Sequence, residues 1–392
     1  MVGSADTFPS KPRLSIGERL GLAAKLTTLV PFRLALYTTY LIYFSLRNRF
    51  RVRFYFMCAA VRMIFLTLSG RQIQYLTPTT RQSYQGWVTK KAKSKAVRAS
   101  SADAARVVRD IEPLSADDDS AVLWIGNRHK AKKFVIFFHG GGYVATALPG
   151  HFEWCWNSYV RTGAEVGVEV AVAFLQYTMC PGGVFPTQLR QAAATLGSLL
   201  DSGIDPADIS IGGDSAGGNL TAQLIGHLLH PNPGARRIEL TEPLGGAFLV
   251  SPWLSVDTRS PSFVANDYND MISSKVVQRL GTEYFGGVEG FKQACRGKNP
   301  WATPMDVDTS WFKGIDDVVA RIYVTVGKRE VLADHGIKFV KVLRTLGVMS
   351  DIRLEETEGE AHDWILLEGE VGSVGDATRR MKDWYKSVIS VN

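Results

Sequence analysis

Cysteine is scarce in this sequence, and the few cysteines present lie far apart. Cys58, Cys155, Cys180 and Cys295 are the only four in 392 residues, and their spacing matches neither a metal-ligand motif nor a disulfide framework. We therefore interpret them as buried free thiols of a protein that works in a reducing compartment. No metal site is expected from them.

Heptads, fixed-period repeats and low-complexity tracts are also missing. The first twenty residues lack an apolar core behind a basic start, so no cleavable secretory signal is expected. We accordingly expect an intracellular protein, either in the cytoplasm or at the surface of the cytoplasmic or endoplasmic reticulum membrane.

Acidic residues are almost absent from the first quarter of the chain. Residues 1–98 hold 17 Lys and Arg against Asp6 and Glu18, a net charge of +15, so the other 294 residues carry −8 within the total of +7. A basic segment joined to an acidic one indicates contact with a polyanion. Nucleic acid is not the expected partner, because no nucleic-acid-reading motif accompanies the charge.

Two long apolar runs occupy the same basic segment. They cover Leu26–Leu46, which contains Arg33 and Pro31, and Phe54–Leu68, and four arginines stand between the two runs. Basic flanks beside apolar and aromatic faces are typical of helices that lie on anionic lipid. The sequence leaves three alternatives open: a membrane span, a membrane-surface contact through residues 26–68, and helices packed on the main domain.

From Ser120 onward, short apolar runs alternate with helix-like segments. Predicted strands cover 121–125, 134–138, 170–174, 209–211, 247–250, 321–326 and 351–356, and predicted helices cover 188–200, 216–230 and 334–346. This alternation predicts a mostly parallel α/β sheet flanked by helices. We predict a main domain over residues 115–392, a mainly helical extension over 1–114 and an inserted cap over 254–318.

The sequence GGDSAGG, residues 212–218, places Ser215 between a predicted strand and a predicted helix. In that setting G-x-S-x-G forms a turn so tight that Gly213 and Gly217 must be nearly free of side chains. The serine oxygen then projects from the carboxyl end of the sheet. This context predicts a nucleophilic serine.

A second glycine-rich stretch, FFHGGGY over residues 137–143, follows an earlier predicted strand. Its glycines allow backbone N–H groups to point at a carbonyl oxygen that becomes negatively charged. We predict the N–H groups of Gly141, Gly142 and Ala216 as the oxyanion donors. His139 is interpreted as a support of this loop and not as a base.

The pair HGGGY and GDSAGG resembles the signature of the hormone-sensitive-lipase-like branch of the α/β-hydrolases. The resemblance runs from about Phe134 to His362 and includes YTMCP (177–181) and SPW (251–253). It implies the α/β-hydrolase fold, a helical cap and activity on carboxylic esters. The basic, apolar N-terminal segment is more loosely similar to that of fungal members related to steryl-acetate hydrolases.

The base and the acid follow the nucleophile in this fold, in the order serine, acid, histidine. His362, in EGEAHDW, occupies the place where the group carries its catalytic histidine, whereas His335 is interpreted as an exposed helical residue. Asp363 is interpreted as solvent-facing.

The acid is predicted in VTVGKREVLADHG, which offers Glu330 and Asp334. Relatives read Asp-x-Leu-x-Asp here, and the first Asp is the catalytic one, so the resemblance points to Glu330, a departure from the common Asp. Asp334 suits the amino terminus of a helix, and it stays the alternative acid.

The predicted function is therefore that of a serine carboxylic-ester hydrolase that needs no cofactor and forms an acyl-serine intermediate. The apolar N-terminal segment and the aromatic residues Trp301, Trp311 and Phe312 favour a hydrophobic ester, such as an acetylated sterol, terpenoid or polyketide. Two alternatives stay open: an acyltransferase with the same acyl-enzyme, and a non-catalytic ligand-binding protein on this fold.

Overall fold

The computed structural model describes residues 11–114, 120–297, 299–349 and 351–390. At its centre is an eight-stranded sheet in the order β1-β2-β4-β3-β5-β6-β7-β8. The strands are β1 (Asp110–Pro113), β2 (Ala121–Ile125), β3 (Lys133–Phe138), β4 (Val170–Gln176), β5 (Ile209–Asp214), β6 (Gly246–Val250), β7 (Ile322–Gly327) and β8 (Ile352–Thr357). Strand β2 runs antiparallel to both of its neighbours, and all other pairs are parallel. The predicted mostly parallel sheet is confirmed.

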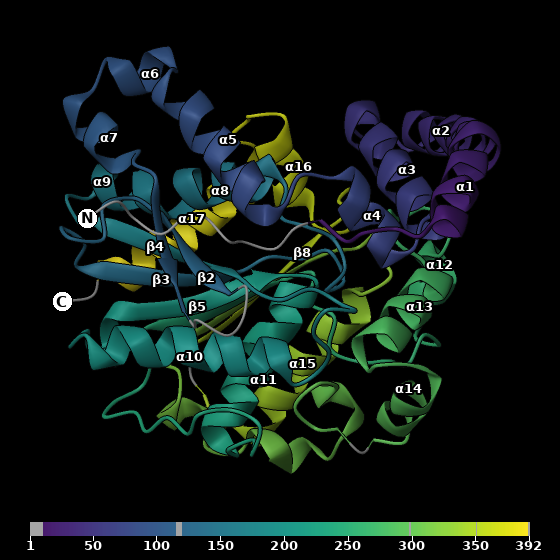
Figure 1. The fold of residues 1–392 in the computed structure, drawn as a ribbon. Helices are drawn as coiled ribbons and strands as arrows, with labels where there is room; N and C mark the ends of the chain where they lie inside the picture. Colours follow the sequence, from purple (N-terminus) through teal and green to yellow (C-terminus); the bar gives the residue numbers. More distant parts are fainter. Residues whose placement is uncertain (1–10, 115–119, 298, 350, 391–392) are drawn as a thin grey trace.

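Helices cover both faces of this sheet (Figure 1). One face carries α10 (Thr187–Asp201), α11 (Ala216–Leu229) and α15 (Ala333–Leu346), and the other carries α8 (Pro149–Cys155), α9 (Arg161–Glu165) and α17 (Asp376–Ile389). Because both faces are covered, strands β2, β4, β5 and β6 are buried along their whole length. This burial explains why they read in the sequence as continuous apolar runs.

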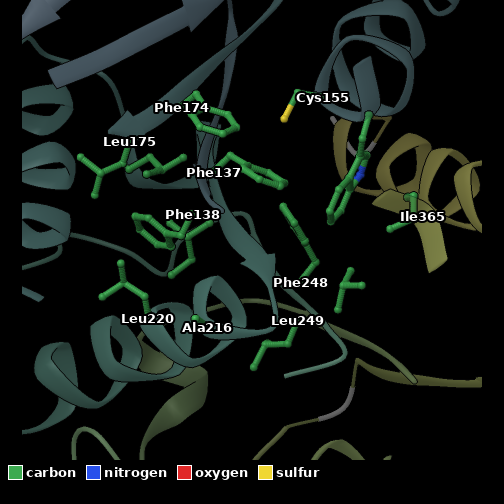
Figure 2. Packing of buried hydrophobic residues seen from close by; sticks show 14 of the residues in the cluster. Phe137, Phe138, Cys155, Phe174, Leu175, Ala216, Leu220, Phe248, Leu249 and Ile365 are labelled. Carbon is green, nitrogen blue, oxygen red and sulfur yellow. The ribbon is translucent and has the colours of Figure 1, made fainter. Parts of the chain in front are cut away.

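Successive side chains of the central strands form the core on the two sides of the sheet (Figure 2). The rings of Phe137, Phe174 and Phe248 pack together on one side, with centroids 5.2 Å apart for Phe137–Phe174 and 6.1 Å for Phe137–Phe248. Phe138 points instead towards Leu220 of α11. The helix that follows Ser215 is therefore anchored on the middle of the sheet.

Strand β1 lies within the segment that was predicted to be helical. Its four residues pair with β2 from Asp110↔Trp124 to Pro113↔Ala121. A short, half-buried edge strand that ends in proline has no clear alternation of polar and apolar residues, so the sequence did not indicate it. The predicted boundary between residues 114 and 115 adjoins 115–119, which lie outside the described residues, and the domain division stays a prediction.

The described part of the N-terminal segment is otherwise helical, as predicted. Its helices are α1 (Ile16–Ala24), α2 (Val30–Arg47), α3 (Val52–Thr67), α4 (Gly70–Leu76), α5 (Thr80–Ala92), α6 (Lys95–Arg98) and α7 (Ser101–Arg106). A π-helical turn over Lys25–Leu29 joins α1 to α2, so that Pro31, which has no N–H to donate, is accommodated in a continuous helix. By length and composition alone, Ile16–Arg47 is long and apolar enough to cross a membrane.

Helices α1–α4 lie together at one end of the molecule, beside α12 and α13 (Figure 1). The elements between β6 and β7, where the cap was predicted, include α12 (Pro261–Asn266), α13 (Ser274–Tyr284) and α14 (Val288–Cys295). Helix α2 packs along α3, and α3 contacts α13. Helices α2, α3 and α13 thus form one continuous layer of packed helices.

The four cysteines are free thiols, and three of them, Cys58, Cys155 and Cys180, are buried as predicted. The prediction is wrong for Cys295, which is exposed at the end of the short helix α14.

Candidate active site

Ser215 occupies the bend between β5 and α11 in a strained conformation, with φ 53° and ψ −112°. A Cβ added to Gly213 would lie 2.0 Å from the carbonyl oxygen of Phe138, and one added to Gly217 would lie 1.8 Å from the same oxygen. The two flanking positions therefore accept only glycine. The Ser215 N–H donates to the carbonyl of Val250 at 2.8 Å, which ties the bend to the neighbouring strand β6.

His362 lies in the loop between β8 and α16 (Trp364–Glu370), and its imidazole reaches Ser215. The distance from His362 Nε2 to Ser215 Oγ is 2.9 Å, and both residues are buried. This is the geometry in which an imidazole can take the proton of the hydroxyl.

Glu330 lies behind the imidazole, directly after the turn that follows β7. Its Oε2 is 3.5 Å from His362 Nδ1 and accepts a hydrogen bond from the Ser251 hydroxyl at 2.5 Å. A separation of 3.5 Å is longer than a normal hydrogen bond, and such contacts in enzymes without substrate often shorten on binding. The structure thus brings together Ser215, His362 and Glu330 in the predicted order.

Asp334 is not part of this group. It stands in the first turn of α15, where its Oδ2 accepts the N–H of Ser262 at 2.8 Å. The predicted role at the amino terminus of its own helix is wrong in detail: Asp334 does not cap α15, and it binds an N–H of the first turn of α12 instead.

The glycine loop presents backbone N–H groups beside the serine. Gly141 and Gly142 have φ of 101° and 61°, and both line the same cavity as Ser215 and His362. In the described part of the chain, no protein acceptor is hydrogen-bonded to the N–H of Gly141, Gly142 or Ala216. These three predicted donors are therefore available to a developing oxyanion.

His139 stabilises this glycine loop through a hydrogen bond and a ring contact. Its Nδ1–H donates to the carbonyl of Gly140 at 2.8 Å, and its ring stacks on Tyr177 with centroids 4.3 Å apart. Complete burial lowers the pKa of His139 to about 3, so the ring stays neutral.

Two buried carboxylates at this site were missed by sequence reasoning. Asp363 was predicted to face solvent, and this is wrong: its left-handed backbone (φ 50°, ψ 44°) turns the side chain inward, with Oδ2 3.2 Å from His362 Nε2. Asp270, in the loop before α13, accepts the N–H groups of His362 at 3.1 Å and of Val331 at 2.9 Å. Burial raises the pKa of Asp270 to about 6.

The carboxylates of Asp363 and Glu330 influence the protonation state of the His362 imidazole. Burial by itself lowers the pKa of His362, but the negative charges of Asp363 and Glu330 outweigh it, so the pKa is raised. The surrounding carboxylates thus stabilise the imidazolium that forms when Ser215 loses its proton.

His335 was predicted to be an exposed helical residue, and this too is wrong. It is buried, and its Nδ1 accepts the N–H of Leu254 at 3.3 Å. Burial lowers its pKa to about 4, so the ring stays neutral. It lies in α15 and takes no part in the group around Ser215.

A cavity of about 320 Å³, the active-site pocket, opens in front of Ser215 and His362. Its lining is largely apolar, and a whole wall comes from α3. The residues of that wall are Phe56, Met57, Ala60, Val61, Ile64 and Phe65, and the pocket is also lined by Met271, Ile272, Val277 and Leu280. The aromatic residues from which a hydrophobic substrate was predicted do not line this pocket. Trp301 and Trp311 pack near His230, and Phe312 packs on Phe339.

Among the described residues, no group of three or more His, Cys, Asp or Glu side chains is arranged so that it could hold a metal ion.

Comparisons with known proteins show the family and the fold of the chain. A family model described as the alpha/beta hydrolase fold matches residues 135–366. The chain is 27% identical over 184 residues to neutral cholesterol ester hydrolase 1 of Bos taurus, covering 45% of this chain and 42% of that protein. It is 22% identical over 242 residues to an acetyl-hydrolase of Streptomyces hygroscopicus, covering 62% of this chain and 71% of that protein.

The solved structures that resemble this chain include an esterase from the bacterial hormone-sensitive lipase family. The TM-score is 0.56 at 22% identity, over 80% of this chain and all of that one. The chain spans less than half of the cholesterol ester hydrolase that it matches. The likeness to the solved structure shows the shared fold.

Proposed function

Because the chain belongs to the α/β-hydrolase family over residues 135–366, we propose that it is a serine carboxylic-ester hydrolase of the hormone-sensitive-lipase-like branch. The observation that carries this proposal is the 2.9 Å contact of Ser215 Oγ with His362 Nε2 at the floor of an apolar pocket. A buried hydroxyl in contact with an imidazole, beside unpaired backbone N–H groups, suits acyl transfer.

In the proposed mechanism, His362 Nε2 takes the proton of Ser215 as Oγ attacks the ester carbonyl. The oxyanion accepts hydrogen bonds from Gly141, Gly142 and Ala216, each of which is worth roughly 10²–10³ in rate. The imidazolium, stabilised by Glu330 through Nδ1, then gives its proton to the departing alkoxide. Water attacks the acyl-serine by the reverse proton path and releases the acid.

The apolar pocket supports a hydrophobic ester with a small acyl group as the substrate. Its volume of about 320 Å³ lies near the lower end of the usual range for small-molecule pockets. Two similar proteins have names that support the two parts of this proposal: acetyl-hydrolase names a small acyl group, and neutral cholesterol ester hydrolase names an ester of a sterol. We therefore propose an acetylated sterol, terpenoid or polyketide alcohol as the substrate class.

A fluorophosphonate probe and a series of p-nitrophenyl esters test this proposal. We expect the probe to label the wild type but not Ser215→Ala, and we expect turnover to fall as the acyl chain lengthens. Equal labelling of both proteins would refute the nucleophile. Product analysis with and without an alcohol acceptor separates hydrolysis from acyl transfer.

We also propose that the protein works at the surface of an anionic membrane facing a reducing compartment, the cytoplasmic or endoplasmic reticulum membrane. Exposed apolar side chains recur every three or four residues along the helix: Leu29, Phe32, Leu36, Tyr40, Tyr43 and Leu46. This stripe is followed by exposed Arg47, Arg49 and Arg53. An apolar helical face with only basic neighbours suits anionic lipid.

Contacts with the rest of the protein support a helix that lies on the membrane. Arg33 donates to the Leu66 carbonyl at 2.8 Å and to the Thr67 hydroxyl at 3.0 Å, and Tyr40 donates to Asn269 at 2.8 Å. A spanning helix would lose these contacts. Because α3 lines the pocket, this orientation places the pocket next to the lipid that dissolves the substrate.

Vesicle flotation tests the membrane contact. We expect binding to vesicles that contain phosphatidylserine and weaker binding at high salt, since exposed charges are screened. Phe32→Glu with Leu36→Glu should abolish flotation, whereas Val264→Glu, at an 80% exposed position outside the stripe, should not. Equal flotation of the two variants, or none by the wild type, would refute the surface, and resistance to alkaline extraction would indicate a span.

A further inference from the structure

Arg62 of α3 is a buried arginine with no acidic partner among the described residues. Only 3% of it is exposed, and its guanidinium lies over the ring of Tyr37 at 5.2 Å. Nη1 donates to the carbonyls of Asp270 at 2.8 Å and Ile272 at 3.0 Å, and Nη2 donates to the carbonyl of Asp267 at 2.5 Å. Among the described residues Nε has no hydrogen-bond partner, so the stabilisation of this buried charge depends on the three carbonyls around Nη1 and Nη2.

The loop that Arg62 holds, residues 267–272, is attached to both partners of Ser215. The Asp270 carboxylate accepts the N–H of His362 through Oδ1 at 3.1 Å. Through Oδ2 it accepts the N–H of Val331, the residue after Glu330, at 2.9 Å. One side chain of the loop thus connects the backbones of the proposed base and the proposed acid.

We propose that Arg62 is a positioning residue for the reaction: through the loop 267–272 and Asp270 it sets the backbone of His362 and Glu330 against Ser215. This inference rests on the proposed hydrolase function. Arg62 lies outside residues 135–366, where the family match is found. In this proposal the N-terminal segment therefore contributes a positioning residue in addition to the pocket wall that α3 forms.

Steady-state kinetics on p-nitrophenyl acetate without vesicles, together with the rate of fluorophosphonate labelling, test this role. Arg62→Met removes the charge and keeps the length of the side chain. We expect kcat and the labelling rate to fall ~10–100-fold, as for a small displacement of reacting groups, with KM changed less than ~threefold. Arg62→Lys, which keeps the charge but cannot reach all three carbonyls, should restore part of the loss.

Arg279→Met is the matched control. Arg279 of α13 also links the N-terminal segment to the helices after β6, because it donates to the Leu68 carbonyl at 2.6 Å, but it makes no hydrogen bond to the loop 267–272. We expect it to keep kcat and the labelling rate within ~threefold of the wild type.

These experiments distinguish a failure of the positioning role of Arg62 from a failure of the proposed hydrolase function. If Arg62→Met folds and keeps wild-type kcat, or if it raises KM instead, or if Arg279→Met loses as much, the positioning role is refuted. If Arg62→Met does not fold, Arg62→Lys decides: we expect an unchanged melting temperature with reduced kcat, and an unchanged kcat refutes the role. A wild type that the probe does not label refutes the hydrolase function itself.

Discussion

At the scale of single residues, two carboxylates four positions apart have different surroundings. Glu330 faces Nδ1 of His362 and is held by the Ser251 hydroxyl. Asp334, in the first turn of α15, accepts the backbone N–H of Ser262 at the start of α12. The first arrangement orients an imidazole, whereas the second stabilises a helix end.

We therefore expect Glu330→Gln to lower kcat by up to ~10⁴-fold, because an amide cannot hold the imidazolium as a carboxylate does. Asp334→Asn should lower the melting temperature and leave kcat within ~threefold. Ester hydrolysis and thermal unfolding of both variants measure these effects. The opposite ranking of the two kcat values would assign the acid to Asp334.

Asp363 gives a prediction for the pH profile. Burial lowers the pKa of His362, but the Asp363 charge is the strongest influence in the other direction. Removing that charge in Asp363→Asn disfavours the imidazolium, so the acidic limb of kcat/KM should move to lower pH. Asp334→Asn should leave the limb in place. A limb that stays fixed or moves to higher pH in Asp363→Asn would contradict this reading.

The residues at this site differ in how far the sequence could predict them. Ser215 and His362 belong to local motifs in a fixed chain order, and the structure brings them together. Asp270 lies 92 residues before His362, in a loop without any motif, and only the fold brings them into contact. Asp363 was misjudged because its inward direction depends on a positive φ that the sequence does not reveal.

At the scale of elements, the turn between β5 and α11 depends on a close approach of backbone to backbone. The carbonyl of Phe138, at the end of β3, lies where a Cβ of Gly213 or Gly217 would be. The packing of the helix onto the sheet and the position of the nucleophile therefore depend on the same contact.

Gly217→Ala should lower the free energy of unfolding by at least ~3 kcal/mol, because its Cβ would lie 1.8 Å from a backbone oxygen. The control is Gly86→Ala, in the exposed middle of α5, where a Cβ meets nothing within 4 Å. It should raise stability by up to ~1 kcal/mol. Urea denaturation measures both, and wild-type stability of Gly217→Ala would contradict the close approach.

Elements with a clear pattern of apolar residues along the sequence were predictable, and elements defined by tertiary contacts were not. The buried strands and the helices 187–201, 216–229 and 333–346 lie within a few residues of their predictions. The edge strand β1 escaped because it is short and half-buried. The wall of the pocket also escaped: α3 is apolar on all sides, so its pattern could not show which face meets substrate.

At the scale of the whole molecule, buried neutral histidines link stability to pH. Burial lowers the pKa of His139 to about 3 and that of His335 to about 4. Between pH ~4 and ~6.5 the unfolded chain binds these protons and the folded protein does not, so they make stability fall as the pH falls. Asp270, with its pKa raised to about 6, acts in the opposite direction.

A comparison of variants isolates one histidine. Between pH ~4 and ~6.5, the free energy of unfolding should fall less steeply with falling pH in His335→Asn than in the wild type. The difference between the two slopes should be up to about 1.4 kcal/mol per pH unit. His129→Asn, at an exposed position, should follow the wild type. Urea denaturation at several pH values measures the slopes, and parallel slopes for His335→Asn and the wild type would contradict the buried neutral form.

The pocket wall formed by α3 has a practical consequence for engineering. Residues 52–67 precede the matched region 135–366, so one wall of the pocket and the reacting atoms are encoded in separate stretches of the chain. A chimera that exchanges this helix for one with different side chains should accept bulkier or slimmer alcohols without any change to the central sheet. Given the proposed role of Arg62, we expect such a graft to work best when it retains an arginine at position 62.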